Sequence, residues 1–141
     1  MDHLKVREYL LSKPEAWEDF PFYPDVAVMK VKNKMFATLS PANAKEIEEH
    51  GNHYRMNVKC DPDEAIQLRD VFESVTAAYH MNKKHWNTVI LNGEVPMGEL
   101  ERMIDNSYAL VVKGMTKAER RSLETAYSAE ELYGESDSYS N

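Results

Sequence analysis

The sequence predicts an α+β fold with two layers, in which an antiparallel sheet carries helices packed on one face. Helical spacing of apolar residues marks both ends of the chain, and β-branched or alternating segments fill much of the middle. The resulting order is helix, strands, helix, strand, helix, helix, with no repeat and no internal linker. An antiparallel sheet covered by helices is the simplest architecture for that order. The 141 residues, 43% of them hydrophobic, are enough to bury one core without covalent cross-links.

The first third of the chain combines one helix, a loop and a hairpin. Apolar residues at helical spacing predict a helix over about residues 3–13, which ends at Pro14. Residues 15–24 contain two prolines and four aromatic residues, which favour an ordered loop folded against the core. From Asp25 onward, two apolar, β-branched runs predict a hairpin with Asn33 at its turn.

The middle of the chain contains a connection, a strand and a helix. Residues 40–54 are polar, so we expect a surface connection that holds one helical turn. Residues 55–60 alternate between polar and apolar side chains, which predicts a half-buried strand. Asp61 and Pro62 then predict a helix start, because aspartate caps helices and proline suits their first position.

The last third contains a strand, two helices and a tail. Residues 85–91 predict another strand, and helical spacing follows it up to Gly114. Residues 116–119 match a capping box for a short final helix. We therefore expect a single domain over residues 1–126 and a polar, frayed tail over residues 127–141.

Several features bear on the compartment and on bound groups. Cys60 is the single cysteine, so it cannot form an internal disulfide, and no Cys/His cluster has the spacing of a zinc site. No export signal opens the sequence, and no apolar run approaches the roughly 20 residues that span a bilayer. We expect a cytoplasmic monomer without metal, cofactor or membrane contact.

Charge is segregated along the chain. The net charge of -7 and the pI near 5.2 argue against a protein that coats nucleic acid indiscriminately. However, residues 26–45 contain four lysines and no acidic residue, and residues 74–93 contain two lysines and no acidic residue. Local surfaces can therefore be basic even though the whole chain is acidic.

Residues 79–88 concentrate polar and aromatic side chains. As a metal site the segment is poor, because His80 and His85 are five residues apart and no acidic residue lies beside them. As a catalytic site it offers an imidazole base, but no nucleophile elbow or carboxylate pair accompanies it. Cys60 falls on the apolar face of its predicted strand, where an inert thiol is expected.

A nucleic-acid surface fits residues 79–88 better. Lys83 and Lys84 can meet phosphates, and Asn82 can hydrogen-bond to bases or backbone. Trp86 can stack on a base, although tryptophan in a strand is more often part of the core. Lysines at strand ends also keep sheet edges soluble, which is the simpler explanation for the same residues.

The chain resembles the MmcQ/YjbR-like family of small bacterial proteins. The resemblance covers most of residues 1–125, and its matching stretches are Glu18–Phe22, Pro24–Val26, Lys34–Ala37, Lys59–Pro62, Tyr79–Thr88 and Asp105–Val112. It implies a frataxin-like (CyaY-like) two-layer fold. It also implies DNA binding through an arrangement described as a double wing.

Three functional hypotheses follow. The leading one is a non-enzymatic protein that binds DNA, with candidate contacts at Lys30, Lys32, Lys34, Asn82, Lys83, Lys84, His85 and Trp86. The second is a pocket for a small molecule or a protein partner, lined by the Tyr79–Thr88 segment and the aromatic loop over residues 17–23. The third is an enzyme that uses His80 or His85, which requires another polar group within hydrogen-bond reach of either ring.

Overall fold

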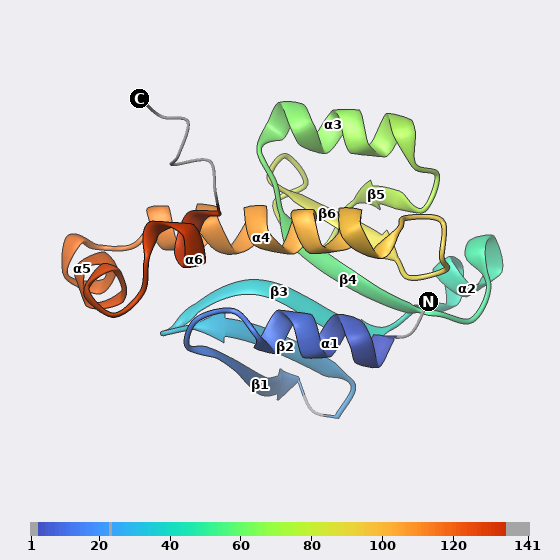
Figure 1. The fold of residues 1–141 in the computed structure, drawn as a ribbon. Coiled ribbons are helices and arrows are strands. Elements are labelled where there is room, and N and C mark those ends of the chain that lie inside the picture. The colour runs from blue at the N-terminus through green and yellow to red at the C-terminus, as the bar shows by residue number, and fades with distance from the viewer. Residues whose placement is uncertain (1–2, 23, 135–141) are drawn as a thin grey trace.

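A six-stranded antiparallel sheet forms the centre of the molecule (Figure 1). The structure is a computed structural model that describes residues 3–22 and 24–134. The strands are β1 (Ala16–Phe22), β2 (Val26–Val31), β3 (Lys34–Pro41), β4 (Tyr54–Lys59), β5 (Val75–Ala77) and β6 (Trp86–Ile90). Their order across the sheet is β1-β2-β3-β4-β6-β5, and every neighbouring pair is antiparallel. The predicted α+β class is confirmed.

The helices are α1 (His3–Leu11), α2 (Ala44–His50), α3 (Pro62–Val71), α4 (Met97–Lys113), α5 (Lys117–Ala126) and α6 (Ala129–Tyr133). Helix α4 packs along β3 and β4, with α1 beside it, and α3 packs near β5 (Figure 1). Helix α2 lies between β3 and β4 in sequence, at the end of the sheet opposite to α5 (Figure 1). No helix in the described part of the chain is long and apolar enough to cross a membrane.

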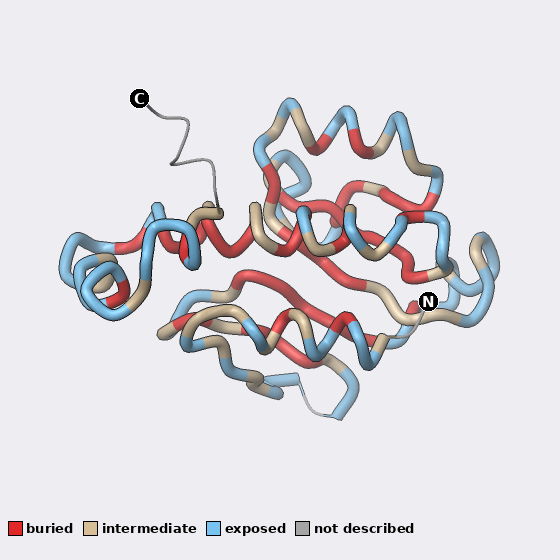
Figure 2. Tube along the Cα trace, viewed as in Figure 1, coloured by how far each residue is buried: buried red, intermediate tan, exposed pale blue. Residues whose placement is uncertain are grey.

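The core lies between the sheet and α4. Buried stretches follow the central strands and the sheet-facing side of α4 (Figure 2). The ring of Tyr108 meets that of Phe36 edge to face, with centroids 5.3 Å apart and planes at 85°. The Tyr108 hydroxyl donates to the Pro14 carbonyl oxygen at 2.7 Å, so one side chain joins α4, β3 and the end of the first helical segment.

The opposite face of the sheet carries a chain of polar side chains. Thr38, Asn57 and Thr88 are paired across β3, β4 and β6. The Asn57 amide donates to the Thr38 hydroxyl at 2.9 Å, and the Thr88 hydroxyl donates to the Asn57 carbonyl oxygen at 2.6 Å. All three are buried, and these hydrogen bonds compensate the loss of water around them.

Several sequence predictions are confirmed. Strands β2 and β3 form the hairpin with Asn33 in its turn. Asp61 caps α3 by accepting from the backbone N–H of Asp63 at 3.2 Å and of Glu64 at 3.3 Å. Thr116 and Glu119 form the predicted capping box of α5.

The structure differs from the predictions in several segments, among them residues 15–24 and the C-terminal segment. The expected aromatic loop is mostly strand β1, whose pairing with β2 is irregular between Asp19 and Phe22, and Tyr23 lies outside the described residues. Proline is tolerated at such an irregularity on an edge strand, which explains Pro21. The expectation of a frayed tail from residue 127 is wrong for residues 129–133, because they form α6, which buries Leu132. Residues 135–141 lie outside the described residues.

Candidate functional site

The register of the sheet brings both lysine-bearing segments to one end. Strand β3 begins, β4 ends and β6 begins at this end, as the pairs Ala37–Val58 and Lys59–Trp86 show. Because neighbouring strands lie about 4.8 Å apart, the starts of β3 and β6 are separated sideways by roughly 10 Å. The turn before β3 and the loop over residues 78–85 therefore flank a common surface.

Three of the predicted lysines are available on this surface. Lys34, Lys83 and Lys84 are exposed and form no ion pair with any residue that the structure describes. Lys59, at the end of β4, lies between the two segments. We call Lys34, Lys59, Lys83 and Lys84 the basic end of the sheet. Sequence reasoning missed Lys59, although the alternation of its strand placed it on the polar face.

Two of the predicted lysines are held by carboxylates instead. The Lys30 ammonium group lies 2.8 Å from Asp19 and 5.2 Å from the centre of the Trp17 ring. Its hydrogen bond lowers the pKa of Asp19. Lys32 lies 3.8 Å from Glu15, and it donates to the hydroxyl of a serine on α5 at 3.1 Å. These pairs weaken the case for either lysine as a phosphate contact.

The remaining predicted residues shape the loop before β6. The Asn82 side chain accepts from the Lys84 backbone at 3.1 Å, and the Asn82 carbonyl accepts from the backbones of His85 and Trp86 at 3.0 and 2.9 Å. Trp86 is only 9% exposed, so its ring packs inside the protein. Asn82 thus orients the loop, and the stacking role of Trp86 is not favoured by its burial.

A cleft opens between α2 and the face of the sheet that carries Thr88. Its volume is about 340 Å³. It is lined by Asn43, Lys45, Glu46, Glu49, His50, Arg55, Thr76, Ala77, Tyr79, His80, Thr88 and Ile90. We call it the α2 cleft. Three residues of the Tyr79–Thr88 segment line it, namely Tyr79, His80 and Thr88, whereas Trp17, Phe20 and Phe22 on β1 line no part of it.

Charges within the α2 cleft are balanced. Arg55 donates to Glu46 at 2.9 Å, and both side chains are mostly buried. Glu46 also closes the capping box of α2 by accepting from the Asn43 backbone at 2.9 Å. Lys45 and Glu49 bring one charge of each sign to the same helix. The walls therefore present donors and acceptors without a strong net field.

The imidazole rings have no oriented partner. Neither His80 nor His85 makes a side-chain hydrogen bond to another described residue. The third polar group that an enzymatic role for either ring requires is therefore missing from the described surroundings. Within those same residues, no group of three or more His, Cys, Asp or Glu side chains is placed to hold a metal ion.

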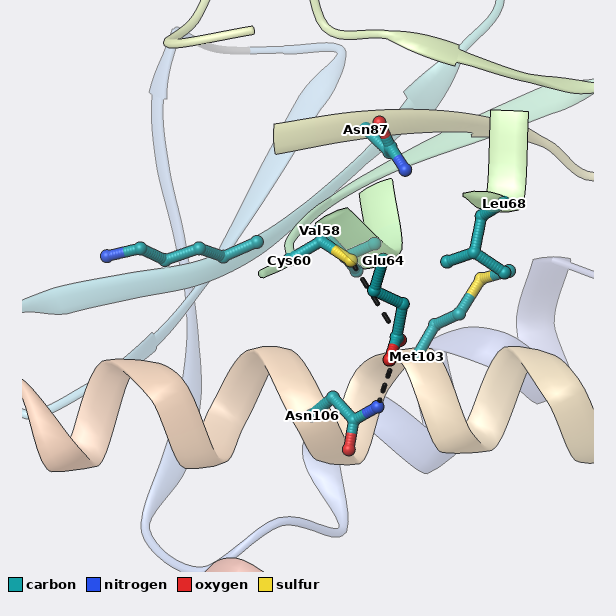
Figure 3. A pocket seen from close by; sticks show the side chains of 8 residues that line it. Val58, Cys60, Glu64, Leu68, Asn87, Met103 and Asn106 are labelled. Atoms are coloured by element: carbon teal, nitrogen blue, oxygen red, sulfur yellow. Dashed lines mark hydrogen bonds between the residues drawn. The ribbon is translucent and has the colours of Figure 1, made fainter. Parts of the chain in front are cut away.

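Cys60 borders a much smaller cavity (Figure 3). Its volume is about 10 Å³, and Val58, Glu64, Leu68, Asn87, Met103 and Asn106 also line it. Burial raises the pKa of the Cys60 thiol to about 11, and the nearby Glu64 carboxylate, 3.9 Å away, acts in the same direction. A cavity of this size has room for about one water molecule, so it offers no space for a substrate.

The comparisons with known proteins decide the family. The family model named YjbR matches residues 11–110. The chain belongs to the YjbR family. Its relatives include YbdF of Escherichia coli O157:H7, 30% identical over 84% of this chain and 91% of the relative. YyaQ of Bacillus subtilis (strain 168) is 31% identical over 77% of this chain and 91% of the relative. Both relatives are named as uncharacterized proteins.

Solved structures agree with this YjbR-family assignment. The Deinococcus radiodurans protein DR2400, with the domain DUF419, matches with a TM-score of 0.73 and 36% identity. That match covers 86% of this chain and 87% of the other chain. A Pseudomonas syringae crystal structure matches with a TM-score of 0.68 and 29% identity, over 79% and 99% of the two chains.

The stretch Asp105–Val112, one of those that carry the resemblance to the YjbR family, makes hydrogen bonds that join α4 to other elements. Asp105 accepts from the Tyr9 hydroxyl at 2.7 Å and from the Lys13 ammonium group at 2.8 Å, which ties α4 to α1. The Ser107 hydroxyl donates to the Phe36 carbonyl oxygen at 2.6 Å and accepts from the Lys59 backbone at 2.8 Å. These contacts explain the polar residues of the stretch without a ligand.

Proposed function

We propose that the chain is a non-enzymatic protein that binds DNA through the basic end of the sheet. The observation that carries the proposal is the placement of Lys34, Lys83 and Lys84. They come from two segments about fifty residues apart in sequence, share one end of the sheet, and form no ion pair with described carboxylates. Ammonium groups free of carboxylates can neutralise phosphates and release counterions.

The proposed DNA surface keeps only some of the residues that the sequence predicted as contacts. Lys30 and Lys32 contribute little, because carboxylates already compensate their charge. Asn82 and His85 support the loop, and Trp86 packs beneath it. Lys59 joins the surface. The double-wing arrangement implied by the family resemblance then corresponds to the β2–β3 turn and the β5–β6 loop, and the frataxin-like topology remains a prediction.

The charge of the whole chain limits the expected affinity. With a net charge of -7, attraction to DNA must come from the local surface against a repulsive total field. Four lysines that each neutralise one phosphate of a duplex give a slope of roughly -3.6 in log affinity against log salt. Raising salt from about 50 to 200 mM should then weaken binding by about 150-fold.

Fluorescence anisotropy with a labelled 20-nucleotide DNA, at those two salt concentrations, tests the proposal. The double variant Lys34→Gln and Lys84→Gln removes one lysine from each segment and should weaken low-salt binding about tenfold, with a shallower salt slope. The matched control, Lys5→Gln and Arg69→Gln, removes the same charge from α1 and α3 and should change affinity less than about twofold. Absence of binding at low salt, or equal effects of both double variants, would contradict the proposal.

The second hypothesis, a pocket for a small molecule or a protein partner, is supported only by the α2 cleft. The cleft contains Tyr79 and His80 from the predicted segment, but it lacks the aromatic residues of β1.

A further inference from the structure

We propose that the α2 cleft binds a single unpaired nucleobase, so that the chain prefers single-stranded or locally opened DNA over an intact duplex. This inference rests on the proposed function, because the phosphates of the same strand would lie against the basic end of the sheet. The lysines of the basic end do not line the α2 cleft, so a base bound there makes a second, separate contact with the protein.

The size of the cleft fits one base. Its volume of about 340 Å³ is at the lower end of the roughly 300–1,000 Å³ typical of small-molecule sites. That space accommodates one base with its sugar, whereas a base-paired duplex is too wide to enter it. A base inside a duplex must therefore leave its stack to enter, and this costs least where it is already unpaired.

The chemistry of the walls favours a neutral, planar group over a phosphate. Arg55 is neutralised by Glu46, and Lys45 is offset by Glu49, so a doubly charged anion gains little inside. The Thr88 hydroxyl donates its hydrogen to Asn57, so toward the cleft its oxygen can act only as an acceptor. Mixed donors and acceptors of this kind suit the edges of a base.

The floor and the rim supply surfaces for a flat ring. Ala77 and Ile90 provide apolar contact on the floor. Tyr79 lines the cleft and is 73% exposed. An exposed aromatic ring beside a cleft offers a surface on which a base can stack.

The cleft and the basic end share one loop. Tyr79 and His80 line the cleft, and Lys83 and Lys84 follow within five residues. Four residues of extended chain span at most about 14 Å, and turns in this loop shorten the distance further. A strand whose base enters the cleft can therefore place neighbouring phosphates beside these lysines.

The test compares four probes by fluorescence anisotropy and calorimetry. They are a 12-nucleotide single strand, its blunt duplex, the same duplex with one unpaired base, and free adenosine monophosphate. We expect the single strand to bind about tenfold more tightly than the blunt duplex, with the duplex carrying the unpaired base in between. Tyr79→Ala should weaken single-strand binding about tenfold and change duplex binding less than twofold.

Two further variants act as controls. Tyr79→Phe keeps the ring and should keep the affinity, because stacking does not need the hydroxyl group. Phe22→Ala removes another exposed aromatic ring, 69% exposed on β1 at the far edge of the sheet, and should have no effect.

The outcomes separate the two proposals. Equal binding of single strand and duplex, unaffected by Tyr79→Ala, would overturn the base site and leave DNA binding in place. Binding of adenosine monophosphate alone, weakened by Tyr79→Ala, would support base recognition and overturn its link to a DNA strand. Absence of binding to all four probes would overturn both proposals.

Discussion

Ser107 joins α4 to two strands at the point where β3 and β4 stop pairing directly. Its hydroxyl bridges the Phe36 carbonyl and the Lys59 N–H, and the side chain is fully buried. Ser107→Ala leaves both backbone groups without this partner, so we expect the free energy of unfolding to fall by about 2–4 kcal/mol in urea titrations. Ser12→Ala, in the exposed turn directly after α1, should change it by less than about 0.5 kcal/mol. Equal effects would show that the bridge is dispensable.

The rate at which the Cys60 thiol is alkylated at different pH values tests whether this side chain is buried. Its thiol pKa is raised from 9.0 to about 11, so thiolate is scarce at pH 7.5 in the folded chain. Alkylation by iodoacetamide should be about 100-fold slower than in urea and should accelerate as pH approaches 11. A raised pKa in the folded state stabilises the fold below pH 9, and this contribution is lost as pH rises from 9 to 11. Labelling at the rate of an exposed thiol would contradict the buried position.

Asp19 limits the contribution of Lys30 to the proposed DNA surface. The carboxylate holds the Lys30 ammonium group at 2.8 Å, and this contact lowers the pKa of Asp19. Asp19→Asn removes the competing charge, so DNA affinity at low salt should rise about two- to fivefold. Glu8→Gln, which removes one charge from an exposed position on α1, serves as the control for the change in net charge. If both variants tighten binding equally, the pairing with Lys30 has no specific effect.

At the scale of elements, α6 is the segment where sequence and structure differ most. Leu132 is 1% exposed and packs in the main core, and α6 lies against α4. Leu132→Ala should lower the free energy of unfolding by about 2–4 kcal/mol, as expected for truncation of a buried leucine. Glu130→Ala, exposed on the same helix, should have little effect. No loss for Leu132→Ala would mean that the tail is frayed from residue 127, as the sequence alone suggests.

Elements with strong local signals were predictable from the sequence. The hairpin around Asn33, the capped start of α3 at Asp61 and the long apolar stripe of α4 were each encoded by neighbouring residues. Strand β5 was missed because its three residues are too few to show alternation. Strand β1 was missed because its proline and exposed aromatic residues suit only an irregular edge strand.

The error about β1 also limited the prediction of the site. The pair between Asp19 and Lys30 forms across β1 and β2, so it could not be foreseen while residues 15–24 were expected to be a loop. Lys34, Lys83 and Lys84 are exposed, but their predicted role as DNA contacts stays a prediction. The α2 cleft was not predictable, since it joins a short helix to strands that are distant in sequence.

At the scale of the whole molecule, function depends on how an acidic chain distributes its charge. Carboxylates neutralise lysines at the β1 edge, and they balance the lysine and arginine inside the α2 cleft. The basic end of the sheet is the place where lysines from separate segments gather without such partners among the described residues. We expect DNA binding at such a local surface to be weak, salt-sensitive and confined to one end of the protein.

Backbone amide shifts of the ¹⁵N-labelled chain, titrated with a 12-nucleotide single strand at about 50 mM salt, test the central claim most directly. DNA binding at the basic end predicts progressive shifts at Lys34, at Lys59 and across residues 79–86, and these shifts should disappear near 200 mM salt. The amides of α1 and of the exposed side of α3 should stay in place. A spectrum without shifts at low salt, or with shifts centred on α1 or α3, would contradict the account.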